Sequence, residues 1–379
     1  MKIVVDDKIP FIRGALDDVA EVVYLPGGSI GRKDVRDADA MVVRTRTRCN
    51  SALLEGSAVK FIATATIGYD HIDTAWCEKA GIAWANAPGC NSSSVEQYIV
   101  SVLLYMADMQ GFEPADKCMG IVGAGNVGSK VARAAAALGF EVLLNDPPRA
   151  AAEGNEGFVA LDELLERSGI VSLHVPLNRV GVYRTESMAD TVFFEKIRRG
   201  AIFINTSRGE VVDEDALREA IRKARVSDAV LDVYRNEPET DRDLLGRLFL
   251  ATPHIAGYST DGKANGTQMS VRAVSRFFGL GLDHWEPVNV PAPEQREIFV
   301  DAAEEDVLIT VGSVYAQTYS VQEDHDRFLA DPGAFETLRG HYRLRREPSA
   351  YHVRVYNDDG QYRKMLEGLG FNVIGDSCY

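Results

Sequence analysis

The segment GIVGAGNVG, residues 120–128, decides the fold that this sequence predicts. It places Gly123, Gly125 and Gly128 in the spacing G-x-G-x-x-G, after a short apolar run and before an alanine-rich segment with helical spacing. In a dinucleotide-binding turn the first glycine allows the tight bend, the second lets the backbone approach a pyrophosphate, and the third lets the helix pack on the strand. The motif alone is a weak signal, but its position between strand and helix favours a dinucleotide site over a turn that binds nothing.

An acidic residue follows at the distance that such a site requires. Asp146 ends the apolar run FEVLLND, eighteen residues after the last glycine of the motif. A carboxylate at this place accepts hydrogen bonds from the ribose hydroxyls of NAD and repels the additional phosphate of NADP. Arg149 lies close by and leaves NADP open as the alternative. We therefore predict NAD as the cofactor, bound by this acid, by the three glycines, and by Asn126 and Val127 between them.

The remaining sequence predicts three folded parts. Apolar runs and helix-length segments alternate around the motif, which is typical of βαβ units in a doubly wound sheet. Residues 1–93 alternate in the same way and predict a second parallel sheet, and Ser93 and Glu96 fit a capping box for the long helix that follows. After a proline-rich linker, residues 286–379 mix strand-like and helical runs. The expected fold class is α/β, with two doubly wound parallel-sheet (Rossmann/flavodoxin-like) domains plus a small C-terminal α+β domain.

The composition restricts the partners and the compartment. The 379 residues include 56 acidic and 41 basic ones, a net charge of -15, which disfavours nucleic acid and anionic membranes as partners. No apolar run approaches the roughly 20 residues that span a bilayer, and the start MKIVVDDKIPF does not resemble a signal peptide. The five cysteines are scattered, without a C-x-x-C pair, which argues against a disulfide framework or a zinc site. We expect a cytoplasmic protein without a metal.

Three later segments carry residues suited to moving a proton beside a nicotinamide. NTSRGEVVDEDAL contains Arg208, LDVYRNEPE contains Glu237 and TPHIAGYST contains His254, each after an apolar run. A histidine can take a hydroxyl proton, a carboxylate can fix its tautomer, and an arginine can hold a substrate carboxylate and polarise a developing carbonyl. From spacing alone, each residue also has an ordinary alternative: a surface charge, an acid at a helix start, and a core histidine.

These three segments and the glycine motif strongly resemble the D-isomer-specific 2-hydroxy-acid dehydrogenase family, over roughly residues 1–285. In that family the equivalent arginine, glutamate and histidine are catalytic. The resemblance implies a substrate domain of residues 1–93 completed by 257–285, and an NAD-binding domain of residues 94–256. The tail, residues 286–379, resembles a dimerisation domain and implies a homodimer.

The resemblance also assigns ligand contacts residue by residue. The positions that contact NAD in the family match Asp146, Thr206, Ser207, Arg208, Asp232 and Gly257. The positions that hold substrate in the most similar members match Thr45, Thr66 and Tyr258. Those members act on a small phosphorylated hydroxy acid, which is therefore the expected partner of this chain.

The segment VVRTRTRCN, residues 42–50, offers a place for the phosphate. If it stays extended, Arg44, Arg46 and Arg48 share one face and form a row of positive charge. Guanidinium groups match phosphate oxygens, although a solvated sheet edge is the ordinary explanation. We predict Arg44 and Arg46 as phosphate ligands and Arg48 as a solvated side chain. The extended row would not persist if Thr45 also turned toward the substrate.

Two positions depart from the family pattern. Val175 stands where a threonine that bonds the cofactor is common, and the segment YRTESMAD at 183–190 differs from the usual histidine-containing version. The sequence leaves other D-2-hydroxy acids, such as phosphoglycerate or hydroxypyruvate, as alternative substrates. It also leaves an NAD-sensing, corepressor-like binding protein as an alternative to an enzyme. Neither the direction of the reaction in the cell nor the re-oxidant of NADH follows from it.

Overall fold

The protein divides into two compact units, each built on its own doubly wound parallel sheet, in a computed structural model. The structure describes residues 1–302, 306–358 and 360–375. The first unit comprises Met1–Asn91 and Tyr258–Ala292, and the second comprises Ser92–Gly257 and Pro293–Tyr379. The α/β class predicted from the sequence is confirmed.

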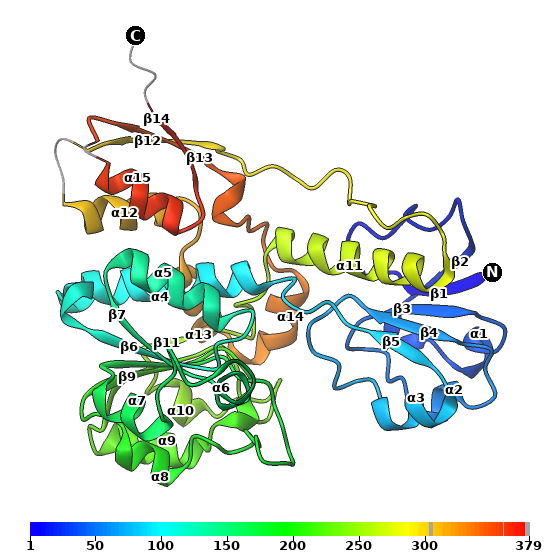
Figure 1. The fold of residues 1–379 in the computed structure, drawn as a ribbon, viewed down its shortest axis with the longest axis horizontal. Coiled ribbons are helices and arrows are strands. Elements are labelled where there is room, and N and C mark those ends of the chain that lie inside the picture. The colour runs from blue at the N-terminus through cyan, green and yellow to red at the C-terminus, as the bar shows by residue number, and fades with distance from the viewer. Residues whose placement is uncertain (303–305, 359, 376–379) are drawn as a thin grey trace. The chain divides into compact units, whose positions relative to one another are not determined.

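The first unit contains a five-stranded parallel sheet in the order β2-β1-β3-β4-β5. Its strands are β1 (Lys2–Asp6), β2 (Glu21–Leu25), β3 (Ala40–Val43), β4 (Phe61–Thr64) and β5 (Ala83–Ala85). β3 and β4 are buried along their whole length, as expected of strands covered on both faces. One face packs against three short helices, α1 (Arg32–Val35), α2 (Ser51–Leu54) and α3 (Thr74–Ala80). The long helix α11 (Thr260–Phe278) covers the opposite face (Figure 1).

The second unit contains a six-stranded parallel sheet in the order β11-β10-β9-β8-β6-β7. Its strands are β6 (Cys118–Val122), β7 (Glu141–Asn145), β8 (Ile170–Leu173), β9 (Ala201–Asn205), β10 (Val226–Leu231) and β11 (Leu250–Ala251). The order reverses between β6 and β8, because β7 lies on one side of β6 and all later strands lie on the other. Ligands of doubly wound sheets bind at the carboxyl ends of the strands beside such a reversal.

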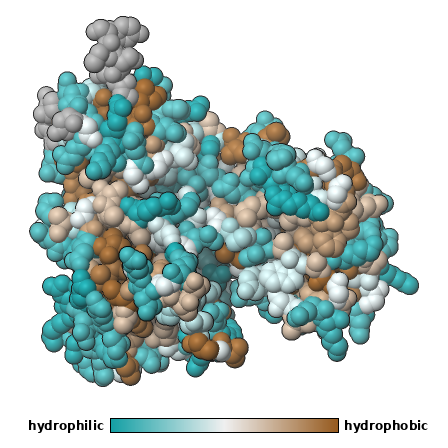
Figure 2. All heavy atoms as spheres, in the orientation of Figure 1, coloured by the Kyte–Doolittle hydropathy of each residue, from teal (hydrophilic) through white to brown (hydrophobic). Residues whose placement is uncertain are grey.

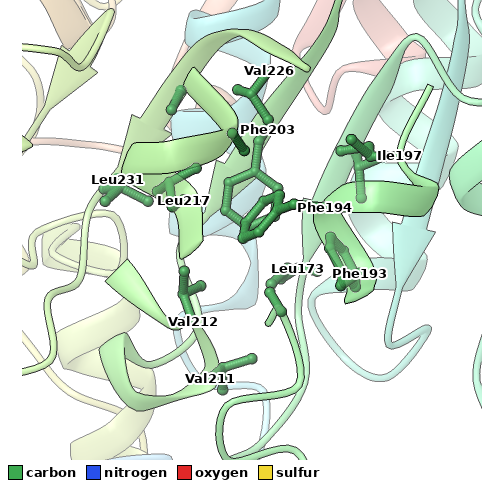
Figure 3. Packing of buried hydrophobic residues seen from close by; sticks show 14 of the residues in the cluster. Leu173, Phe193, Phe194, Ile197, Phe203, Val211, Val212, Leu217, Val226 and Leu231 are labelled. Atoms are coloured by element: carbon green, nitrogen blue, oxygen red, sulfur yellow. The ribbon is translucent and has the colours of Figure 1, made fainter. Parts of the chain in front are cut away.

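Helices cover both faces of this second sheet. The helices α4 (Ser92–Gln110) and α5 (Gly128–Leu138) lie together on one side (Figure 1). The other side carries α7 (Leu161–Arg167), α8 (Thr191–Lys196) and α9 (Glu214–Arg222). There Phe203 of β9 meets the rings of Phe193 and Phe194 edge-on, with ring centres 6.1 and 5.2 Å away (Figure 3). Each buried phenylalanine contributes about 1.5–3 kcal/mol, so this cluster fixes the strand whose end carries Arg208.

The C-terminal segment has a small sheet of its own, in the order β12-β13-β14. Its elements are β12 (Glu297–Asp301), α12 (Val307–Ala316), α13 (Val321–Ala330), α14 (Phe335–Gly340), β13 (His352–Tyr356), α15 (Gln361–Gly368) and β14 (Asn372–Gly375). Phe328 of α13 and Phe335 of α14 are nevertheless buried in the core of the six-stranded sheet, beside the ring of Tyr234. The segment therefore shares a core with the six-stranded sheet, and the separate domain expected for residues 286–379 stays a prediction.

Two local features bear on the sequence analysis. The capping box predicted at Ser93 and Glu96 is wrong, because α4 begins at Ser92 and the Ser93 hydroxyl accepts a hydrogen bond from Lys130 Nζ at 2.5 Å. Among the described helices, none combines the length and apolarity needed to cross a membrane. On the face shown in Figure 2, hydrophilic residues are interspersed with separate apolar patches.

Candidate active site

The glycine turn has the geometry that the sequence predicts. Gly123 has φ +90°, and a Cβ there would lie 2.7 Å from the carbonyl oxygen of His174. A Cβ on Gly128 would lie 1.9 Å from the carbonyl oxygen of Gly123, so only glycine fits at either position. Gly125 has open space around it instead. A glycine that nothing in the protein requires for packing fits the close approach of a pyrophosphate. Val175, the departure from the family pattern, lies against the turn at Gly123.

Asp146 lies beside this turn, at the end of β7. Its Oδ2 accepts a hydrogen bond from Ala124 N at 2.8 Å, and its Oδ1 accepts one from Arg149 N at 3.0 Å. The side chain of Arg149 donates to Ala124 O at 2.6 Å and pairs with Glu153 at 2.7 Å. Because Glu153 already neutralises this guanidinium, the arginine is a poor ligand for a ribose phosphate. The arrangement favours NAD over NADP.

The loop after β9 carries the next predicted cofactor residues. The Ser207 hydroxyl donates to Asn205 Oδ1 at 2.7 Å, whereas the buried hydroxyl of Thr206 has no partner among the described residues. A buried polar atom without a partner is costly, and a bound molecule would supply one. The Thr206 hydroxyl, the open space at Gly125 and the turn at Gly123 together fit a bound NAD. Asn126 is exposed in the same turn, and Val127 directly precedes α5.

Arg208 and Glu237 lie on neighbouring loops, because β9 and β10 are adjacent strands. A Cβ on Gly209 would lie 2.0 Å from the backbone of Tyr234, so only glycine lets the two loops pack this closely. Arg208 is half-buried and donates from Nη1 to Ser207 O at 2.7 Å. The structure thus places the predicted arginine at the carboxyl edge of the sheet, one strand away from the glutamate.

Glu237 and His254 form a direct pair. Glu237 Oε2 lies 2.7 Å from His254 Nδ1, and Glu237 Oε1 accepts from Tyr234 N at 2.9 Å. Burial raises the pKa of Glu237, but the hydrogen bond and charge of His254 outweigh it, so the net shift is downward. An ionised carboxylate can only accept, which puts the proton of a neutral imidazole on Nδ1 and leaves the Nε2 lone pair available.

Asp232 organises the loop that carries His254. Its buried carboxylate accepts hydrogen bonds from the Thr252 hydroxyl, Ile255 N and Ala256 N, at 2.7, 2.8 and 2.9 Å. Burial raises the pKa of Asp232 to about 6, against the lowering effect of His254 and these bonds. His254 itself has φ +56°, a conformation that needs such support. The resemblance assigned Asp232 to cofactor contact, and in the structure its carboxylate binds the loop that leads to Gly257.

In the first unit, the arginine row is not extended. β3 ends at Val43, and Thr47 N donates to Arg44 O at 3.1 Å, which closes a turn that contains Thr45. The cause is the buried carboxylate of Asp6, whose Oδ2 lies 3.1 Å from Arg44 Nε and draws this arginine inward. Arg46 and Thr45 are exposed on the turn.

The other predicted substrate residues follow β4 and precede α11. The Thr66 hydroxyl donates to Gly68 O at 2.8 Å and lies 2.8 Å from the Thr64 hydroxyl. Tyr258 is half-buried, and Lys263 Nζ lies 4.9 Å from its ring centre.

Among the described residues, no group of three or more His, Cys, Asp or Glu is arranged to hold a metal ion. The four cysteines in the described ranges, Cys49, Cys77, Cys90 and Cys118, are buried thiols that form no disulfide, and Cys378 lies outside those ranges.

Comparisons with known proteins agree with this arrangement. The profile of the family described as "D-isomer specific 2-hydroxyacid dehydrogenase, NAD binding domain" matches residues 95–256. The erythronate-4-phosphate dehydrogenase of Bacteroides thetaiotaomicron is 50% identical over 354 residues, which cover 93% of this chain and 99% of that protein. The Escherichia coli protein of the same name is 40% identical, with 99% of both chains covered.

A solved structure is similar as well. The D-lactate dehydrogenase from Aquifex aeolicus, complexed with NAD and lactic acid, superimposes with a TM-score of 0.62 and 25% identity. The match covers 77% of this chain and 100% of that chain. The cofactor prediction of NAD is thereby confirmed.

Proposed function

Because this chain belongs to the D-isomer-specific 2-hydroxyacid dehydrogenase family, we propose that it oxidises 4-phospho-D-erythronate with NAD, in pyridoxal phosphate biosynthesis. The product is 2-oxo-3-hydroxy-4-phosphobutanoate. The observation that carries the proposal is the 2.7 Å pair of Glu237 and His254 at the carboxyl edge of the cofactor sheet. An intact pair of this kind favours an enzyme over an NAD-sensing binding protein.

His254 acts as the general base. Glu237 accepts a hydrogen bond from the protonated Nδ1 of the imidazole, so the lone pair of Nε2 can accept the proton of the C2 hydroxyl. As the O–H bond breaks, its electron pair forms the C2 carbonyl, and the electron pair of the C2–H bond leaves as hydride. Bound NAD supplies the acceptor for that hydride. The imidazolium that results is stabilised by the ionised Glu237.

Arg208 holds the substrate carboxylate and polarises the C2 oxygen. Its guanidinium is anchored at Nη1 by Ser207 O, which fixes the orientation of the planar group. A guanidinium binds a carboxylate through two parallel hydrogen bonds and stabilises the partial charge that develops on the carbonyl oxygen.

The phosphate group is bound by residues of the first unit. Arg44, Thr45, Arg46, Thr66 and Tyr258 are the residues that we assign to the substrate. The ion pair with Asp6 holds Arg44 at the base of its turn, which leaves Arg46 exposed at the tip. Hydrogen bonds between charged groups contribute about 1.5–3 kcal/mol each.

We further propose a cytoplasmic homodimer that assembles through the C-terminal sheet. α12 and α15 cover one face of β12–β13–β14 (Figure 1). The alternate residues of β12 and β13 face away from these helices, and among them Phe299 is 59% and Tyr356 37% exposed. The same face carries the ion pair of Arg354 with Glu297, 3.4 Å apart. A second copy of the chain would bury these two exposed rings within a polar surrounding, and two-fold dimers are the commonest oligomers. The cysteines in the described ranges are buried and form no disulfide, which fits a reducing compartment.

A panel of hydroxy acids, read by NADH absorbance, tests the reaction. We expect turnover of 4-phospho-D-erythronate and weak turnover of D-erythronate, 3-phosphoglycerate and hydroxypyruvate, the last with NADH. His254→Asn should bind NAD normally and lose about 10²–10⁴-fold in kcat, the usual contribution of general acid–base catalysis. His284→Asn, at an exposed position, is the control and should keep full activity. A preference for 3-phosphoglycerate would assign another substrate, and an active His254→Asn protein would remove the assigned base.

The phosphate assignment has a separate test within the same short segment. Arg46→Ala should raise the KM of the phosphorylated acid by about tenfold or more, because a lost charge-assisted bond costs about 1.5–3 kcal/mol. The KM of D-erythronate should not change. Arg48→Ala is the matched control and should leave both values unaltered. An equal effect of Arg46→Ala on both substrates would mean that this arginine only supports the turn.

A further inference from the structure

We propose that the C-terminal segment takes part in catalysis, because Arg345 positions the loop that carries His254. The inference deepens the proposed function and rests on it, since it assumes that His254 is the base. Arg345 is a positioning residue here: its contacts are with the backbone beside His254 and not with the imidazole.

Arg345 is buried and joins two parts of the second unit. Only 2% of its surface is exposed. Nη1 donates to Ile255 O and Ala256 O at 3.4 and 3.3 Å, in the two residues directly after His254. Nε donates to Gln97 Oε1 at 2.8 Å, and Nη2 donates to Ser94 O, both on α4. One side chain thus ties the catalytic loop to the long helix behind it.

The same two residues are also held by Asp232. Its carboxylate accepts from Ile255 N and Ala256 N, while Arg345 donates to the carbonyl oxygens of the same residues. Opposite charges therefore hold the N–H and C=O groups of one short stretch. His254 precedes this stretch with φ +56°, so its side-chain direction depends on the stretch staying in place.

A second residue of the segment holds the strand that enters the loop. His325 of α13 accepts a hydrogen bond from Ala251 N on β11 through Nδ1, at 2.9 Å. β11 is the edge strand of its sheet, and this amide finds its acceptor in the tail. The C-terminal segment thus contacts the backbone both before and after His254.

The surroundings explain why an arginine occupies this position. Its guanidinium has five donors and meets four acceptors, and it stacks on the Tyr319 ring at 3.8 Å from the ring centre. The buried carboxylate of Asp324, which accepts from the hydroxyls of Tyr319 and Tyr342 at 3.0 and 2.5 Å, supplies nearby negative charge. The ammonium group of a lysine has only three donors and is not planar, so it cannot stack on the Tyr319 ring and can replace only part of these interactions.

The experiment compares Arg345→Met and Arg345→Lys with Arg343→Met in the full-length chain. Arg343 is two residues away and contacts Glu323, Asp324 and Ser320 O, not the catalytic loop, so its removal also controls for any change around Asp324. We expect Arg345→Met to lower kcat by about tenfold to a hundredfold, the scale of a 1 Å misplacement, with little change in the KM of substrate or the Kd of NAD. Arg345→Lys should recover part of this loss. The pH at which kcat is half-maximal should move in Arg345→Met and stay fixed in Arg343→Met.

A role of Arg345 in protein stability alone would give different results for Arg345→Met. If Arg345 were only a structural tie, Arg345→Met would lower the Tm while the folded fraction kept the kcat and pH profile of the wild type, and that result would overturn the inference. If Arg345→Met does not fold, His325→Leu and His325→Asn decide. The asparagine can accept from Ala251 N and should keep more of kcat than the leucine; equal kcat in both would also overturn it. An inactive His254→Asn protein beside a fully active Arg345→Met protein would reject this inference and leave the proposed function standing.

Discussion

At the scale of a single residue, Asp146 has partners within the protein before any cofactor binds. Its two carboxylate oxygens accept from Ala124 N and Arg149 N, so it ties the end of β7 to the glycine turn and caps α6 (Pro147–Glu153). Each oxygen has a second lone pair, which leaves room for ribose hydroxyls. The same acid can therefore shape the turn and select the cofactor.

Replacing Asp146 separates these two roles. Asp146→Asn keeps an acceptor for one backbone N–H but loses the charge, whereas Asp146→Ala loses both. We expect either change to weaken NAD by tenfold or more, the result of losing a charge-assisted bond of about 1.5–3 kcal/mol, and to relax discrimination against NADP. Cofactor titrations of both variants measure this, with Asp162→Ala, at an exposed position of α7, as the control. Equal weakening of NAD and NADP would limit Asp146 to a structural role.

A residue's role could be predicted from the sequence when the partners that determine it lie nearby in the chain. The glycines and Asp146 could be predicted, because a turn and the next strand fix their places within one βαβ unit. The pairing of Glu237 with His254 came from the resemblance, and the structure shows its geometry. The role of Arg345 could not be predicted, since its acceptors lie 90 and 89 positions away in the chain and no pattern links them.

At the scale of the element, hydrophobic spacing predicted strands and helices better than their ends. The long helix was expected from its apolar spacing, but it begins at Ser92, and the Ser93 hydroxyl accepts a hydrogen bond from Lys130 of α5. The arginine segment forms a turn, and its Arg44 pairs with the buried Asp6. In both places a charged side chain from a distant element makes a contact that the local pattern does not indicate.

α4 also buries an acid whose ionisation opposes folding. Burial raises the pKa of Glu96 from 4.5 to about 7, although Lys130 and Arg133 lower it. The folded state therefore prefers the protonated form, and this favourable contribution is lost as pH rises from about 4.5 to about 7. Glu96→Gln removes the charge, so its Tm should exceed that of the wild type at pH 8 and by much less at pH 5. Each pKa unit corresponds to about 1.4 kcal/mol.

Thermal unfolding at the two pH values, with Asp108→Asn as the control on the exposed end of α4, checks this expectation. The control should not change the difference between pH 5 and pH 8. A Glu96→Gln protein that is less stable than the wild type at pH 8 would show that Glu96 is ionised and well paired in the folded protein.

At the scale of the whole molecule, the topology of both sheets follows from short-range rules, whereas the packing of the tail does not. Successive βαβ units can wind in few ways, so two doubly wound sheets were predictable. Nothing in the sequence indicates that Phe328 and Phe335 enter the core of the cofactor sheet, because aromatic residues at helical spacing fit any core. The predicted linker therefore did not imply that the tail packs independently.

Dimerisation and catalysis should be separable in this chain. Arg345 binds α4 and the loop after His254, whereas Phe299 and Tyr356 lie on the exposed face of β12–β13–β14. Changing both of the latter to aspartate places charge on that face and should yield a monomer, because burying two unpaired carboxylates is unfavourable. Since the contacts on the catalytic loop remain intact, kcat should stay within about threefold of the wild type, far less than the loss from removing one catalytic group.

Light scattering over a range of protein concentrations, together with NADH absorbance on the same samples, measures both effects. Val192→Asp is the matched control, because this residue is 54% exposed on α8. This helix packs against the six-stranded sheet and not against the C-terminal sheet. The control variant should remain a dimer. A Phe299→Asp, Tyr356→Asp protein that stays dimeric would place the interface elsewhere. A monomer without turnover would mean that the site is completed by the second copy, and that the tail supports catalysis across the dimer as well as within one chain.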